Sequence, residues 1–234
     1  MNAKIVFLGQ AGLYVETDGL KIIIDPYLSN SVEKINPEKH RRQPIEETWF
    51  KVKPNVLLFT HDHLDHYDED TVKNYLSKDT EITILSPRSV WEKVRLFGGK
   101  NNFVLFDAGT IWTEKGVQFQ AVKAEHSDRN AIGIILMIGK ERYYITGDTL
   151  YSERVLQSLP KRKITAVFLP INGEGNNMNA TDAARFAKRL KAKWVVPVHF
   201  GLFDALTGNE LDLKNVKIPH IYQEIRFEDA KEFT

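Results

Sequence analysis

The sequence contains no cysteine among its 234 residues, which excludes disulfides and thiolate metal sites. Charge of one sign is not in excess, because 32 Lys and Arg residues face 31 Asp and Glu residues. We therefore expect neither a nucleic-acid nor a membrane partner. The longest apolar run, Ile132–Ile138, is far shorter than the ~20 residues of a membrane helix, and no signal peptide is recognisable. These absences predict a cytoplasmic protein whose metal ligands, if any, are His, Asp, Glu or backbone atoms.

Short apolar runs alternate with polar turns, which predicts many strands. Asn55–Thr60 is a continuous apolar run typical of a buried strand, and Ile132–Ile138 and Arg142–Thr146 are expected to form a hairpin. Further strands are expected at Lys4–Leu8, Tyr14–Thr17, Lys21–Asp25, Ile82–Leu85, Phe103–Phe106, Gln118–Ala124, Ala166–Pro170, Lys193–Val198 and His220–Phe227. Helices are expected at Asp70–Ser77, Ser89–Phe97 and Glu153–Ser158, and from a cap at Asn179. We predict one α/β domain over residues 1–234, with two mixed sheets packed together and helices outside.

One long polar stretch, Ser29–Thr48, is predicted to be a loop. It contains two prolines and the basic run Lys39–Arg42. A loop of this length in a compact domain is usually functional or mobile, and whether it forms a lid over a site stays open. The basic run could receive a phosphate, although such runs are more often simply solvated.

Three of the seven histidines lie within Thr60–His66, immediately after an apolar strand. His61 and His63 are two residues apart, so both can reach one ion from an extended or tightly turned loop. Asp65 and His66 diverge from that pair and suit a second ion. Imidazole and carboxylate groups are suitable ligands for Zn²⁺, Mn²⁺ or Fe. The alternative is a polar loop with fortuitous histidines.

The pattern His-x-His-x-Asp-His after an apolar strand resembles the metallo-β-lactamase superfamily. That family continues with a lone His, an Asp after a hairpin and a late His after a strand. His126, Asp148 and His199 occur in this order, so the resemblance spans about Ile5 to Phe203. It implies a four-layer αββα sandwich and a hydrolase that depends on one or two divalent metal ions. Zn²⁺ and Mn²⁺ are favoured, and Fe is a further candidate.

The resemblance also implies a role for each ligand. His61, His63 and His126 would hold one ion; Asp65, His66 and His199 would hold the other; and Asp148 would bridge them. A hydroxide between the ions would be the nucleophile, with Asp65 and Asp148 as catalytic residues that orient it and manage its proton. Asp25 matches a family Asp that supports the histidine loop, and we expect it to accept a hydrogen bond from a ligand imidazole.

A finer resemblance is to the L-ascorbate-6-phosphate lactonase (UlaG-like) branch. It is carried by four segments: Leu169–Gly173, Asn177–Asn179, Asp182–Ala184 and Pro197–Gly201. It implies that the small-molecule substrate is a lactone or ester, such as that of a phosphorylated sugar acid. Asn172 and Asn177 could then hydrogen-bond substrate hydroxyls or a developing oxyanion, or they could simply be loop and cap residues.

Two rival functions stay open on the sequence alone. The same ligands would serve a phosphodiesterase acting on a nucleotide or lipid-type diester, and a non-catalytic metal-binding protein is the alternative of another class.

His63 stands where the diiron oxygen-reducing branch has Glu, which argues against oxygen chemistry. The short interval between Asp148 and His199 leaves no room for a nuclease insertion. A homo-oligomer is compatible with the sequence.

Overall fold

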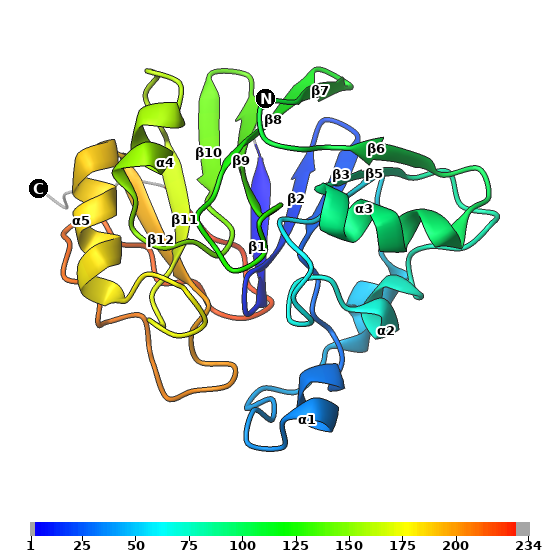
Figure 1. Ribbon diagram of the computed structural model, residues 1–234, viewed down its shortest axis with the longest axis horizontal. Helices are drawn as coiled ribbons and strands as arrows, with labels where there is room; N and C mark the ends of the chain where they lie inside the picture. Colours follow the sequence, from blue (N-terminus) through cyan, green and yellow to red (C-terminus); the bar gives the residue numbers. More distant parts are fainter. Residues whose placement is uncertain (1–2, 228–234) are drawn as a thin grey trace, which may run out of the picture.

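Two six-stranded sheets form the centre of the molecule (Figure 1). The computed structural model describes residues 3–227, so the predicted domain span of 1–234 extends past the described residues at both ends. The first sheet contains, in spatial order, β1 Lys4–Gly9, β2 Gly12–Thr17, β3 Leu20–Ile24, β4 Val56–Leu58, β5 Thr83–Ser86 and β6 Asn102–Leu105. The second contains, in spatial order, β12 Trp194–Val198, β11 Ala166–Pro170, β10 Glu141–Ile145, β9 Ile132–Ile138, β8 Val117–Lys123 and β7 Ile111–Glu114.

Both sheets are mixed, as predicted. Strands β3 to β6 pair in parallel, and β1 and β2 are antiparallel additions. In the second sheet, β10, β11 and β12 are parallel, and β7, β8 and β9 are antiparallel. The α-helices are α1 Ser31–Ile35, α2 Glu69–Val72, α3 Arg88–Val94, α4 Glu153–Ser158 and α5 Ala180–Leu190, and the 3₁₀ helices are η1 Glu47–Lys51 and η2 Arg95–Phe97. Helix α3 packs on β5 and β6, and α4 and α5 pack on the second sheet, which gives the predicted αββα layers (Figure 1).

The main core lies between the sheets. Ile22 and Leu58 of the first sheet and Ile134 and Phe168 of the second belong to one cluster of buried apolar side chains. Because each sheet buries its inner face against the other and its outer face under helices, the strands read as continuous apolar runs. That explains why the runs at β4, β9 and β11 could be recognised in the sequence.

Helix boundaries follow local signals in the sequence. The Asn179 side chain accepts a hydrogen bond from the backbone N–H of Asp182, which confirms the predicted cap of α5. Helix α3 and η2 together cover the helix predicted at Ser89–Phe97, and the chain turns at Gly98 with φ of +61°. No helix within residues 3–227 is long and apolar enough to cross a membrane.

Two predictions about elements are wrong, and one strand was missed. Helix α2 ends at Val72, before the predicted end at Ser77, because the N–H groups of Asn74 and Tyr75 each bond three residues back in tighter turns. Strand β7 was not predicted, because it is a partly exposed edge strand without an apolar run. No strand forms over His220–Phe227, where Glu224 makes one isolated bridge to Val6. Tyr222 has φ of +63°, which interrupts an extended backbone there.

The strands that precede the candidate site residues end at one edge. The parallel register pairs Ile24 of β3 with Leu58 of β4 and Pro170 of β11 with Val198 of β12. The two sheets meet at this edge, where the N–H of Ile132 donates to the carbonyl of Thr60 at 2.9 Å. Loops that lie far apart in the sequence are thereby brought to one place.

Candidate metal centre

Asp25 supports the loop that contains His61, His63 and His66. This carboxylate is fully buried and accepts hydrogen bonds from the backbone N–H and the hydroxyl of Thr60. Its Oδ2 also lies 2.8 Å from Nδ1 of His66. The Thr60 hydroxyl lies 3.0 Å from Nδ1 of His61. Because Nδ1 of both rings is engaged, Nε2 of His61 and of His66 points toward the centre.

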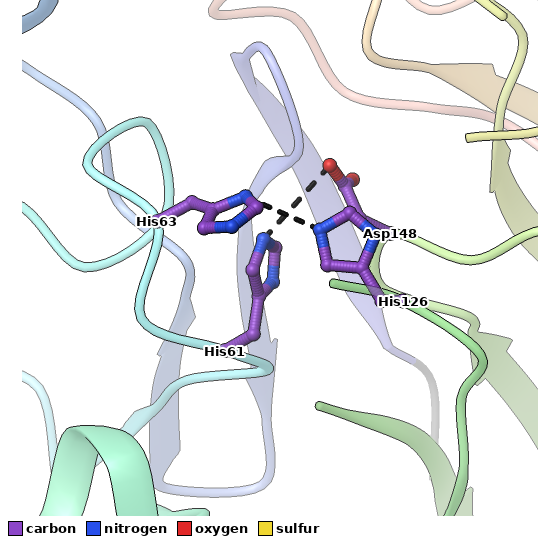
Figure 2. A group of neighbouring side chains, drawn as sticks. All are labelled: His61, His63, His126 and Asp148. Atoms are coloured by element: carbon purple, nitrogen blue, oxygen red, sulfur yellow. Dashed lines mark hydrogen bonds and ion pairs between the residues drawn. The ribbon is translucent and has the colours of Figure 1, made fainter. Parts of the chain in front are cut away.

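Four side chains form the first ligand group: His61, His63, His126 and Asp148. Figure 2 shows the three imidazoles and the carboxylate converging from three separate loops. Each pair of the three rings has centroids 4.7 Å apart, so the rings form an even triangle. One ligand atom from each of the four residues lies within 4.8 Å of the others. Three imidazoles and one carboxylate can surround one ion tetrahedrally.

Three more side chains form the second ligand group: Asp65, His66 and His199. Their ligand atoms also lie within 4.8 Å of one another. Nε2 of His199 lies 3.1 Å from Oδ2 of Asp65. Metal–ligand bonds of about 2.0–2.2 Å place neighbouring ligand atoms roughly 2.9–3.6 Å apart, so this separation suits one ion.

Asp148 connects the two groups. Its Oδ2 lies 3.2 Å from Nε2 of His199 and 3.9 Å from Nε2 of His61, and its Oδ1 lies 3.3 Å from Nε2 of His66. Gly147 makes this approach possible, because it has φ of +61° and a Cβ there would lie 2.9 Å from Cβ of Thr60. One buried carboxylate is therefore shared by both groups.

The donor set fits a cation. Nε2 of His61 and Nε2 of His66 are buried and make no hydrogen bond within the described residues. Such orphaned atoms are costly unless something coordinates them. The cluster is therefore able to bind metal, and it consists of nitrogen and oxygen donors that suit several divalent ions.

The two groups differ in their affinity for protons. Burial lowers the pKa of His61, and the neighbouring His66 lowers it further. Burial also acts to lower the pKa of His66 and of His199, but the neighbouring carboxylates, Asp148 foremost, together outweigh it; they raise the pKa of His66 and raise that of His199 to about 9. Burial would raise the pKa of Asp148, but His199 and His66 hold it well below its usual range. Without an ion, His66 and His199 therefore keep a proton to higher pH than His61 does.

The two predicted asparagines are placed differently. Nδ2 of Asn177 donates to Oδ2 of Asp148 at 2.8 Å, so this buried residue contacts a ligand directly. Asn172 makes a backbone bridge to Asn179, and among the described residues its buried Oδ1 has no hydrogen-bond partner. The contacts with substrate that we predicted for these two residues stay predictions.

Sequence reasoning missed two polar residues beside the ligands. Gln10, in the turn between β1 and β2, donates from Nε2 to Oδ2 of Asp65 at 2.7 Å. Asp128 accepts from the backbone N–H of Asp62, which separates His61 from His63, and from the hydroxyl of Ser89. Two features of the sequence could have pointed to these residues. Gln10 lies in a short turn between two glycines, and Asp128 lies two residues after His126.

Replacing Asp128 by alanine is expected to weaken binding of an ion in the first ligand group about tenfold. The carboxylate ties the His61–His63 loop to α3, and loss of such an outer contact typically costs 10–100-fold in metal affinity. Zn²⁺ competition against a chromophoric chelator measures this, with the exposed Asp79→Ala as the control. An unchanged affinity in Asp128→Ala would show that the loop holds its shape without this contact.

The predicted loop Ser29–Thr48 lies against two segments of the site. The N–H of Arg42 donates to the carbonyl of Leu202 at 2.9 Å, three residues after His199. Lys39 pairs with Glu174 at 3.1 Å, in the segment that leads to Asn177. The loop contains α1 and the first two residues of η1. It therefore lies against the segment that follows His199 and the segment that leads to Asn177, and whether it forms a lid stays a prediction.

The comparisons with known proteins agree with this arrangement. A family described as "Beta-lactamase superfamily domain" matches residues 4–199. The UPF0173 metal-dependent hydrolase TV0864 of Thermoplasma volcanium is 31% identical over 229 residues, which is 92% of each chain. The UPF0173 metal-dependent hydrolase YtkL of Bacillus subtilis is 28% identical, over 87% of this chain and 88% of that protein.

Solved structures resemble the whole chain. Igni18, a metallo hydrolase from Ignicoccus hospitalis, has a TM-score of 0.78 at 20% identity and covers 97% of this chain and 99% of its own. The isothiocyanate hydrolase from Delia radicum gut bacteria has a TM-score of 0.77 at 20% identity and covers 97% of this chain and 100% of its own. At these identities the likeness shows the fold.

Proposed function

The chain belongs to the metallo-β-lactamase superfamily and, within it, to the UPF0173 metal-dependent hydrolases, and we propose that it hydrolyses a lactone or ester of a small molecule. The chain is a metal-dependent hydrolase, and what we propose is its specificity for an ester or lactone. The observation that carries the proposal is the shared Asp148 carboxylate, which lies within 3.9 Å of imidazoles from both ligand groups.

We assign the two ligand groups to two divalent ions, with Zn²⁺ or Mn²⁺ preferred. Ions bound there would supply Lewis acidity toward the scissile group and would lower the pKa of water to near neutrality. The first group would hold one ion, the second group the other, and Asp148 both. The resemblance of Leu169–Gly173 and Pro197–Gly201 to the L-ascorbate-6-phosphate lactonase branch supports a lactone, including one with a phosphate group.

The remaining residues orient groups and hold protons. Asp25 fixes the ring of His66 through Nδ1 and so directs Nε2 inward. Asn177 fixes one oxygen of Asp148 through its amide N–H. Asp65 and Asp148 are the carboxylates placed to accept a proton from an attacking water and to deliver it to the leaving oxygen. The leaving alcohol of an ester or lactone needs that proton.

The test uses protein stripped of metal with a chelator and then reloaded with Zn²⁺ or Mn²⁺. A panel of sugar lactones, a chromogenic carboxylic ester and a chromogenic phosphodiester are assayed side by side. We expect lactone or ester turnover that chelation removes and metal restores. His63→Ala should lose it, and His220→Ala, an exposed histidine outside both ligand groups, should keep it.

Two results would overturn the proposal. Turnover of the phosphodiester alone would replace the ester substrate with a phosphate diester. Full activity in metal-free protein or in His63→Ala would remove the metal-dependent chemistry at these residues.

A further inference from the structure

Gln10 contacts two residues of the second ligand group at once. Its side-chain Nε2 lies 2.7 Å from Oδ2 of Asp65, and 3.0 and 3.1 Å from the two ring nitrogens of His199. The residue is 2% exposed, so the amide is committed to these partners rather than to water. A buried amide in such contacts fixes both neighbours.

The two contacted residues come from different sheets. Asp65 belongs to the loop after β4 of the first sheet, and His199 follows β12 of the second. Gln10 lies between β1 and β2 in the first sheet. An ion in the second ligand group would therefore be bound by residues from both sheets. Its ligands must be held at fixed distances from one another although they come from different sheets.

The backbone of Gln10 reinforces the same link. Its carbonyl accepts the N–H of His199 at 2.6 Å. Gln10 has φ of +52° and His199 has φ of +59°, a region that residues other than glycine rarely adopt. Such conformations cost free energy and persist only where surrounding contacts impose them. Here the imposed geometry brings the His199 ring to Asp65.

The other histidines have outer partners of their own. Thr60 contacts Nδ1 of His61, Asp25 contacts Nδ1 of His66, and the carbonyl of Asn176 lies 3.2 Å from Nδ1 of His126. For His199, the polar ring contact from outside the two ligand groups is Gln10. Outer partners of this kind set the orientation of a ligand ring.

We propose that Gln10 is the positioning residue of the second ligand group, and that it holds Asp65 and His199 at the separation that one divalent cation requires. This inference rests on the proposed metal chemistry. Since Gln10 makes no side-chain hydrogen bond to the first ligand group within the described residues, losing the amide should weaken binding of the second ion and leave binding of the first ion nearly unchanged.

The experiment titrates metal-free protein with Co²⁺, followed by calorimetry and by visible absorption. Wild type is compared with Gln10→Leu, which keeps the size of the side chain and removes its hydrogen bonds. Gln10→Met is a second variant of similar volume, and Gln157→Leu, exposed on α4, is the matched control. Thermal melting of each metal-free protein reports whether the variant folds.

We expect two Co²⁺ ions in wild type and in Gln157→Leu. In Gln10→Leu and Gln10→Met the first ion should bind within about twofold of wild type, and the second at least about tenfold more weakly. Equal second-ion affinity in all proteins, equal weakening of both ions, or a single ion in wild type would each overturn the role of Gln10. Wild type that binds no Co²⁺ would instead overturn the proposed function itself.

Discussion

Asp148→Ala is expected to lower the rate of hydrolysis at least about a thousandfold and to leave at most one ion per chain. Asp148 is the carboxylate that reaches His61, His66 and His199 together. Removing it takes a negative ligand from both ions and a proton-holding group from the reaction. A loss of about 4 kcal/mol of transition-state stabilisation corresponds to this factor, because each 1.36 kcal/mol is tenfold. Metal content by mass spectrometry and the rate with the best substrate of the panel measure it.

Two further variants separate charge from shape. Asp148→Asn keeps the volume of the side chain and loses its charge, so it should retain the first ion, which three imidazoles still bind, and lose the second. Asp212→Ala removes an exposed carboxylate in the loop after β12 and should match wild type in metal content and rate. If Asp148→Ala kept two ions at wild-type affinity, the carboxylate would not bridge the groups.

The seven candidate ligand positions could be proposed from the sequence because their chemistry is visible in residue type and in position. His126, Asp148 and His199 each follow a strand, and strand ends in packed sheets collect at one edge. The structure brings these three together with the histidine loop. The separations could not be predicted, because they depend on the register of β3 with β4 and of β11 with β12, and on close approaches such as that at Gly147.

Residues that act through the ligands were harder to predict. Gln10 and Asp128 are ordinary polar residues in turns, and their contacts join segments 55 and 66 residues away in sequence. Asp25, Gln10 and His199 all have positive φ, although none is glycine. Local propensity gives the opposite expectation, so only the tertiary contacts around them explain these conformations. Asp25 could be anticipated only through the resemblance, because it matches the family Asp that supports the histidine loop; its place before Pro26 fits an ordinary hairpin end equally well.

The fold was predictable where strands are buried on both faces. The apolar runs of β9 and β11 gave correct bounds, because a strand covered by a sheet and by helices needs no polar face. Edge strand β7 has alternating partial exposure, so it shows no run. At the other extreme, His220–Phe227 alternates well enough to suggest a strand, yet the left-handed Tyr222 breaks it.

The affinity of the second ion is expected to rise at least about a hundredfold between pH 6.5 and 8.5, because the proton displaced from His199 alone accounts for that factor and the proton of His66 adds to it. His199 has a pKa raised to about 9, and the pKa of His66 is also raised. A cation must displace these protons, and each displaced proton makes affinity rise about tenfold per pH unit while the group is protonated. His61 and His126 should release no proton to the first ion in this window, because their pKa values are lowered.

The stability of the metal-free protein should change in the opposite direction. A histidine whose pKa is raised by folding stabilises the folded state fully below its unfolded pKa of about 6.5. That contribution is lost as the pH rises through about 9. The melting temperature without metal should therefore fall from pH 6.5 to 9, while the increase in melting temperature caused by added Zn²⁺ grows.

Calorimetry in two buffers of different ionisation enthalpy counts the protons that are released when the second ion binds. Release of no proton by the second ion at pH 7 would contradict the assignment of His66 and His199 as protonated ligands, and His220→Ala should leave the count unchanged.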